Sequence, residues 1–160
     1  MNSVIPAKAG TAPAVCVCIL ALLAGCAYQP LSQTNLQEAQ SRWAATHCSR
    51  YRLRLDIAGD RIEAGNFSVE VDGPNTRVTR NGRVLEHPDA FYSVEGLFHF
   101  LANEIELGHD PPRFFEAAPD ATVYQQIIYD KTWGYPQRYV RAISGTSHNI
   151  TLDIKDFSTR

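Results

Sequence analysis

The stretch Arg50-Tyr51-Arg52-Leu53-Arg54-Leu55-Asp56-Ile57 decides the fold, because its polar and apolar residues alternate without a break. Successive side chains of a β-strand point to opposite faces of the sheet. The aromatic and aliphatic residues therefore share one buried face, and the three arginines share a solvated face with the aspartate. Such a strand is typical of an antiparallel sheet with a core on one side and water on the other.

Further strands are expected on both sides of this stretch. Phe67, Val69 and Val71 alternate with polar residues, and Asp72-Gly73-Pro74-Asn75 predicts a turn into a short strand over 77–79. Asn81-Gly82 is the strongest two-residue hairpin signal and leads to another short strand. Three more strands are expected over 122–129, 138–143 and 149–156, the last with period-two alternation.

Two helices are predicted between and before these strands. Residues 34–46 carry apolar residues at helical spacing, and Thr34 with Gln37 matches a capping box; Trp43 on this helix is expected to anchor the core. Ser93 caps a second helix over 94–107, which Gly108 is expected to end before a proline-rich loop over 110–120.

The order of these elements predicts one α+β domain over residues 33–160. We expect a single antiparallel sheet of about five to six strands with two helices packed on one face. Its core is predicted to contain seven residues from both halves of the chain: Leu53, Leu55, Val69, Leu97, Leu101, Ile127 and Leu152.

The N-terminus predicts export and a lipid anchor. About 11 residues from Ala14 to Ala24 are apolar without interruption, enough for a helix of about 16 Å, which suits a signal peptide and is too short to span a bilayer. The end of this run, together with the next two residues, reads Leu23-Ala24-Gly25-Cys26. This motif resembles the lipobox of bacterial lipoproteins, whose cysteine is acylated. We expect a signal peptide over 1–25 and a lipidated Cys26 with a short tether over 26–32. Ala27 resembles the signal for the outer membrane, which places the protein on its periplasmic face.

The net charge and the number of cysteines bear on nucleic-acid binding and on disulfide formation. The chain has 17 acidic and 15 basic residues and a net charge of −2, so nothing indicates a nucleic-acid partner. Once the signal peptide is removed and Cys26 modified, Cys48 is the one remaining thiol and cannot form an internal disulfide. We expect Cys48 to be buried and inert.

The run Tyr129-Asp130-Lys131-Thr132-Trp133-Gly134-Tyr135-Pro136 is the most distinctive motif. Together with Arg42-Trp43 and Val94-Glu95-Gly96-Leu97-Phe98, it resembles small bacterial lipoproteins that carry the domain of unknown function 6174. The resemblance would cover nearly the whole mature chain. It implies a fold and an anchor, but no activity and no catalytic residue.

Two groups of residues are candidates for contact with a partner. Trp133 and Tyr135 either fold over the edge of the sheet or stand at a hairpin tip as contact residues. Arg52, with Arg50 and Arg54, either meets an anionic partner or pairs across the strands with Glu70 and Asp72.

Motifs for catalysis, cofactors and metals are lacking in the sequence. We find no phosphate loop, paired metal ligands or nucleophile motif, and Ser144, Ser147 and His148 would need a third partner to form a triad. The polar face of the second helix, which carries Glu95, is expected to be solvated. The sequence therefore favours a membrane-tethered binding or accessory protein whose partner is another envelope protein. The alternatives are a surface that binds anions or cell-wall polymer, and an envelope hydrolase.

Overall fold

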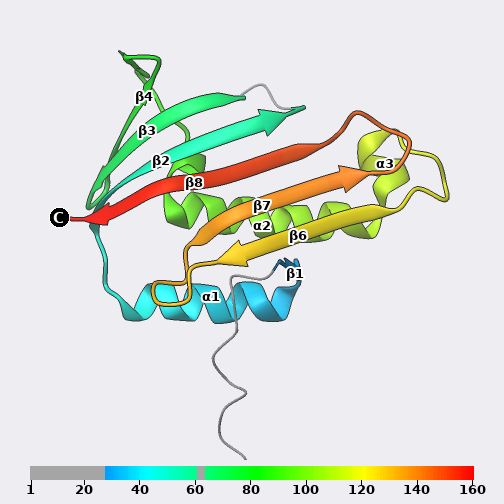
Figure 1. Cartoon of the computed structure of the whole chain (residues 1–160), viewed down its shortest axis with the longest axis horizontal. Coiled ribbons are helices and arrows are strands. Elements are labelled where there is room, and N and C mark those ends of the chain that lie inside the picture. The colour runs from blue at the N-terminus through cyan, green and yellow to red at the C-terminus, as the bar shows by residue number, and fades with distance from the viewer. Residues whose placement is uncertain (1–27, 61–63) are drawn as a thin grey trace, which may run out of the picture.

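A computed structural model describes residues 28–60 and 64–160, which form one α+β domain around one sheet (Figure 1). Cys26 and the predicted signal peptide lie outside the described residues. The elements in chain order are β1 (Gln29–Pro30), α1 (Gln33–Ala45), β2 (Arg50–Gly59), β3 (Gly65–Asp72), β4 (Asn75–Arg80), β5 (Arg83–Val84), the 3-10 helix η1 (Ala90–Tyr92), α2 (Val94–His109), α3 (Pro111–Phe115), β6 (Val123–Tyr129), β7 (Pro136–Ile143) and β8 (Ile150–Thr159).

The sheet has eight antiparallel strands in the order β1-β6-β7-β8-β2-β3-β4-β5, which corrects the expected five to six. The two outermost strands, β1 and β5, have only two residues each. β5 was expected from the Asn81-Gly82 hairpin, whereas β1 is too short to show any alternation in the sequence. β2 and β8 lie side by side in the middle of the sheet, so the two halves of the chain meet there.

β1 lies inside the segment predicted as a tether. Gln29 pairs with Ile127, Pro30 pairs with Gln126, and the Leu31 amide donates to the Gln125 carbonyl at 3.0 Å. The sheet therefore begins three residues after Cys26 in the sequence.

A bulge between β2 and β8 keeps the two faces of the sheet separate. Leu55 pairs with Ile154 but Arg54 pairs with Asp156, so Lys155 is an extra residue in β8. With strict alternation from Ile154, Asp156 would face the core and Phe157 the solvent. The bulge reverses this and brings Phe157 to the core side, opposite Leu53.

The helices cover one face of the sheet, and no helix crosses the face turned to the viewer in Figure 1. α1 begins at a capping box of Ser32 and Asn35 rather than the predicted Thr34 and Gln37, because Ser32 adopts the extended conformation that a cap requires. Ser93 caps α2 as predicted, but this helix continues through Gly108 to His109. The loop predicted over 110–120 contains the five-residue α3.

One hydrophobic core lies between the helices and the sheet. All seven predicted core residues are buried in it, with exposed fractions of 5% or less, and Trp43 is buried as well. The predicted Asn81-Gly82 hairpin is confirmed: both residues have positive φ, 51° and 78°, as a two-residue turn between β4 and β5 requires.

We expect Leu101→Ala to lower the free energy of unfolding by about 2–5 kcal/mol, because Leu101 is 1% exposed and its loss leaves a cavity. Urea denaturation of the purified protein measures the change. Val84→Ala is the control: Val84 is 49% exposed and the loss should stay below about 0.5 kcal/mol. Equal losses in the two variants would contradict the assignment of the core.

Candidate ligand-binding face

The helix-free face of the sheet carries a groove of about 400 Å³ across β8, β2, β3 and β4. Its polar lining comes from eight residues that point away from the core, and all of them are charged or carry a hydroxyl: Arg52, Arg54, Ser68, Glu70, Arg77, Thr79, Asp156 and Ser158. The period-two pattern of β2 places its arginines here, because Tyr51, Leu53 and Leu55 occupy the covered side.

The arginines of β2 form ion pairs with neighbouring strands. Arg50 Nε lies 2.8 Å from Asp72 Oδ1, and Arg52 Nη2 lies 3.3 Å from Glu70 Oε1. The predicted cross-strand pairing with Glu70 and Asp72 is therefore present. Arg54 Nη1 adds a contact of 3.2 Å to Asp156 of β8. Five of these six side chains are more than half-exposed and Glu70 is one-third exposed, so each pair contributes at most about 1 kcal/mol to stability.

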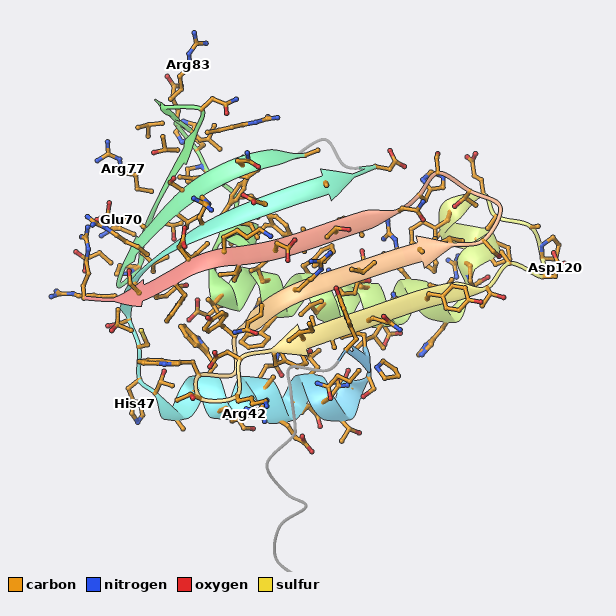
Figure 2. All side chains as sticks on the ribbon, in the orientation of Figure 1. Arg42, His47, Glu70, Arg77, Arg83 and Asp120 are labelled. Atoms are coloured by element: carbon orange, nitrogen blue, oxygen red, sulfur yellow. The ribbon has the colours of Figure 1, made fainter. Side chains whose placement is uncertain are left out.

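Glu70 is contacted by more than one arginine. Arg160 also forms an ion pair with Glu70, and Arg77 stands opposite Glu70 in the register of β3 and β4. Figure 2 shows Glu70 and Arg77 at the same end of the sheet, with Arg83 farther out on the β4–β5 hairpin. Within the described residues Arg77 has no ion pair.

The distinctive motif over 129–136 is a structural hairpin between β6 and β7. The Asp130 carboxylate accepts hydrogen bonds from the amides of Thr132 and Trp133, at 2.9 and 2.6 Å. Gly134 has a φ of +83°, and a Cβ there would lie 2.4 Å from the Ala39 carbonyl oxygen of α1. Only glycine fits both the conformation and the approach to the helix.

The two aromatic residues of this motif face the interior of the protein. Tyr135 is 8% exposed and stacks on Phe157, with ring centroids 4.4 Å apart. Burial removes Tyr135 from the candidate contact residues, because a partner would have to displace it from the core. Trp133 is half-buried and lies 5.8 Å from the same ring. The structural interpretation of the motif is thus favoured for both residues.

The polar face of α2 is exposed as predicted, and Glu95 on that face also bonds to α1 and β2. Its two carboxylate oxygens accept hydrogen bonds from Trp43 Nε1 at 2.9 Å and from the Tyr51 hydroxyl at 3.1 Å. The Tyr51 hydroxyl in turn accepts from the Val94 amide at 2.9 Å. Burial raises the pKa of Tyr51 above its ordinary value, so the phenol stays protonated and can donate to Glu95. This network ties α1, β2 and α2 together.

A buried ion pair between α2 and β7 was missed by the sequence analysis. Glu104 and Arg141 are 2% and 6% exposed, and Arg141 Nη1 lies 2.7 Å from Glu104 Oε2. The Tyr139 hydroxyl donates to the same carboxylate at 2.8 Å. Burial, and then the Glu104 charge, raises the pKa of Tyr139, which keeps this donor protonated. Phe115 of α3 covers the guanidinium at 4.4 Å.

A sequence signal for this pair exists. Glu104 follows Leu101 by three residues, on the apolar stripe of α2. Arg141 alternates with Tyr139 and Ile143, so it occupies a core-facing position of β7. Two opposite charges at positions that should be apolar indicate that they pair. Because both side chains are enclosed and bonded to each other, the pair serves structure rather than ligand binding.

The remaining candidates provide no reactive group. Cys48 is half-buried rather than fully buried, and burial raises the pKa of its thiol, which disfavours the nucleophilic thiolate. His148 Nδ1 contacts Asp60, a partner that the sequence did not indicate, but no hydroxyl of residues 28–60 or 64–160 bonds to the other ring nitrogen. No group of three or more metal-ligating side chains occurs in the same residues.

Comparison with known proteins finds no matching family model and no matching curated protein. None of the helices in the described part of the chain has the length and apolar character needed to cross a membrane. The candidate surface is therefore assigned from geometry alone.

We expect Gly134→Ala to destabilise the protein by at least about 2 kcal/mol, since the new methyl group meets the α1 backbone and the left-handed conformation strains alanine. Gly145→Ala is the matched control. Gly145 has a φ of +74° but nothing within 4 Å, so only the conformational cost of about 1 kcal/mol remains. Thermal unfolding compares the two, and equal shifts would show that the helix contact contributes nothing.

We expect Glu104→Ala to cost about 3–5 kcal/mol of unfolding free energy, because Arg141 would be left as an unpaired buried charge. Glu70→Ala removes a carboxylate that is one-third exposed and should cost about 1 kcal/mol or less. Chemical denaturation of both variants tests the contrast. A loss below about 1 kcal/mol for Glu104→Ala would mean that the pair is solvated.

Proposed function

We propose that this protein is a lipid-anchored binding protein of the bacterial cell envelope that carries out no chemical step of its own. The proposed anchor is an acylated Cys26, and the proposed location is the periplasmic face of the outer membrane. Its partner would be another envelope protein or an anionic envelope component.

The position of β1 is the observation that carries this proposal. Gln29 is hydrogen-bonded into the sheet, and three residues can span at most about 10 Å between it and Cys26. A lipid on Cys26 would hold the β1 edge of the sheet against the bilayer.

Two exposed aromatic residues support the same orientation. Tyr28 is 44% exposed just before β1, and Tyr124 is 59% exposed on the neighbouring β6. Tyrosine has an apolar ring and a polar hydroxyl, and it is enriched where protein meets the headgroup region of a membrane. Arg138 lies 5.9 Å from the Tyr28 ring and adds a positive charge near this edge.

Catalysis finds less support than binding. The most deeply buried polar cluster, Glu104 with Arg141 and Tyr139, has its oxygens engaged within the core. The Asp60–His148 pair has no nucleophile bonded to it among the described residues. A hydrolase needs polar groups that converge on an open cleft with a nucleophile and an oxyanion site.

An acylation assay tests the proposal. Labelled fatty acid should enter the wild-type protein in a bacterial host and should not enter Cys26→Ser, because Cys26 is the cysteine of the lipobox-like motif. The wild type should sediment with membranes and the variant should be released from them. Cys48→Ser is the control and should label as the wild type does. Label in Cys26→Ser would refute the anchor.

A further inference from the structure

We propose that the groove on the helix-free face binds a phosphomonoester group, with Arg77, Arg52 and Arg54 as its guanidinium donors. This inference rests on the proposed function and deepens it, since it gives the binding protein a class of ligand. The groove is formed entirely by described residues of β8, β2, β3 and β4.

The groove has more positive than negative charge. Three guanidinium groups line it against only two carboxylates: Arg52, Arg54 and Arg77 with Glu70 and Asp156. One positive charge is left over, and it belongs to Arg77, which has no ion pair within the described residues. A phosphomonoester carries about −1.5 to −2 charges at pH 7, so it is attracted to this excess.

The paired arginines keep free donors. Arg52 and Arg54 each reach their carboxylate with one terminal nitrogen, at 3.3 and 3.2 Å, and their side chains are 58% and 52% exposed. A guanidinium has five N–H donors, so most of them remain available to phosphate oxygens. Glu70 and Asp156 would thus hold the arginines in place without saturating them.

The size and lining of the hollow suit a small phosphorylated molecule. A volume of about 400 Å³ lies within the usual range of small-ligand sites, from about 300 to 1,000 Å³. The hydroxyls of Ser68, Thr79 and Ser158 line the same groove and can bond to phosphate or sugar oxygens.

The excess of positive charge is local to the groove. Farther along the same face Asp56 stands opposite Asp153, and Asp153 is contacted by Arg138 at 3.6 Å and Lys155 at 3.1 Å. Two acids and two bases balance there. A generally basic face would attract any polyanion, whereas this arrangement directs an anion to one place.

A soluble phosphorylated sugar fits the position better than a lipid headgroup does. β2 lies four strands from β1 in the sheet, which is about 19 Å at the usual strand spacing. If the β1 edge faces the bilayer, the groove is held away from the headgroups of that bilayer. The ligand chemistry is the same in both cases, so the experiment must separate the two sources.

Calorimetric titration of the full-length protein in detergent tests the site with four probes: hexose 6-phosphate, the uncharged hexose, inorganic phosphate and short-chain phosphatidic acid. We expect saturable binding of hexose 6-phosphate and none of the hexose. Arg77→Gln should weaken that binding about tenfold or more, because it removes an unpaired guanidinium from the groove. Arg83→Gln is the matched control: Arg83 is exposed on β5 outside the groove, so the net charge changes equally.

The outcomes decide the proposal. Retained binding in Arg83→Gln, within about twofold, together with the loss in Arg77→Gln supports the site. Binding of phosphatidic acid alone with the same Arg77 dependence also supports it and assigns the source to lipid. Three results would overturn it: equal losses of binding in both variants, equal binding of the uncharged hexose, or no saturable binding of any phosphorylated probe up to about 10 mM.

Near-ultraviolet circular dichroism verifies that both variants are folded. None of these results depends on acylation, so the anchor is tested separately.

Discussion

The separation of the two faces of β2 is the constraint on which the rest of the structure depends. This strand lies between β8 and β3, and its alternate residues supply both the centre of the core and the arginines of the groove. A slip of one residue in its pairing would exchange the two sets. Full burial of Tyr51 and Leu55 makes that exchange costly, because it would expose apolar side chains and bury arginines.

The bulge in β8 extends this constraint to the distant motif over 129–136. By turning Phe157 to the core side, the extra residue supplies the ring on which Tyr135 stacks and against which Trp43 and Trp133 pack. The hairpin between β6 and β7 is thereby fixed against α1, where Gly134 meets the helix backbone. The aromatic residues of this motif are explained by a packing arrangement that joins three segments, and they need no partner to account for them.

The alternation of β2 and β3 allowed their strand character, buried residues and cross-strand ion pairs to be predicted from the sequence. Periodicity succeeds there because both strands are long and one face of each is covered. It fails for β1, whose two residues form a strand only because β6 offers a free edge.

The Glu104–Arg141 pair was not predicted for a different reason. Its members are far apart in sequence, and each alone is read as a surface charge. The sequence placed the arginines of β2 on one face of the sheet. It could not predict the groove or the contact of Arg160 with Glu70, because both depend on β8 lying beside β2, and these strands are far apart in sequence.

The buried and the exposed ion pairs of this protein contribute differently to its stability. Glu104 and Arg141 are enclosed, so neither can be kept without the other, and their presence follows from the packing of α2 on β7. The arginines of the helix-free face differ, because each could lose its partner without leaving a buried charge. Their ion pairs are solvated and contribute little to the free energy of folding. The number of arginines on this face could therefore change with little effect on stability. The surplus of positive charge over the groove is therefore not needed for folding. The proposed anion site would give that surplus a role, because a positively charged hollow attracts anions.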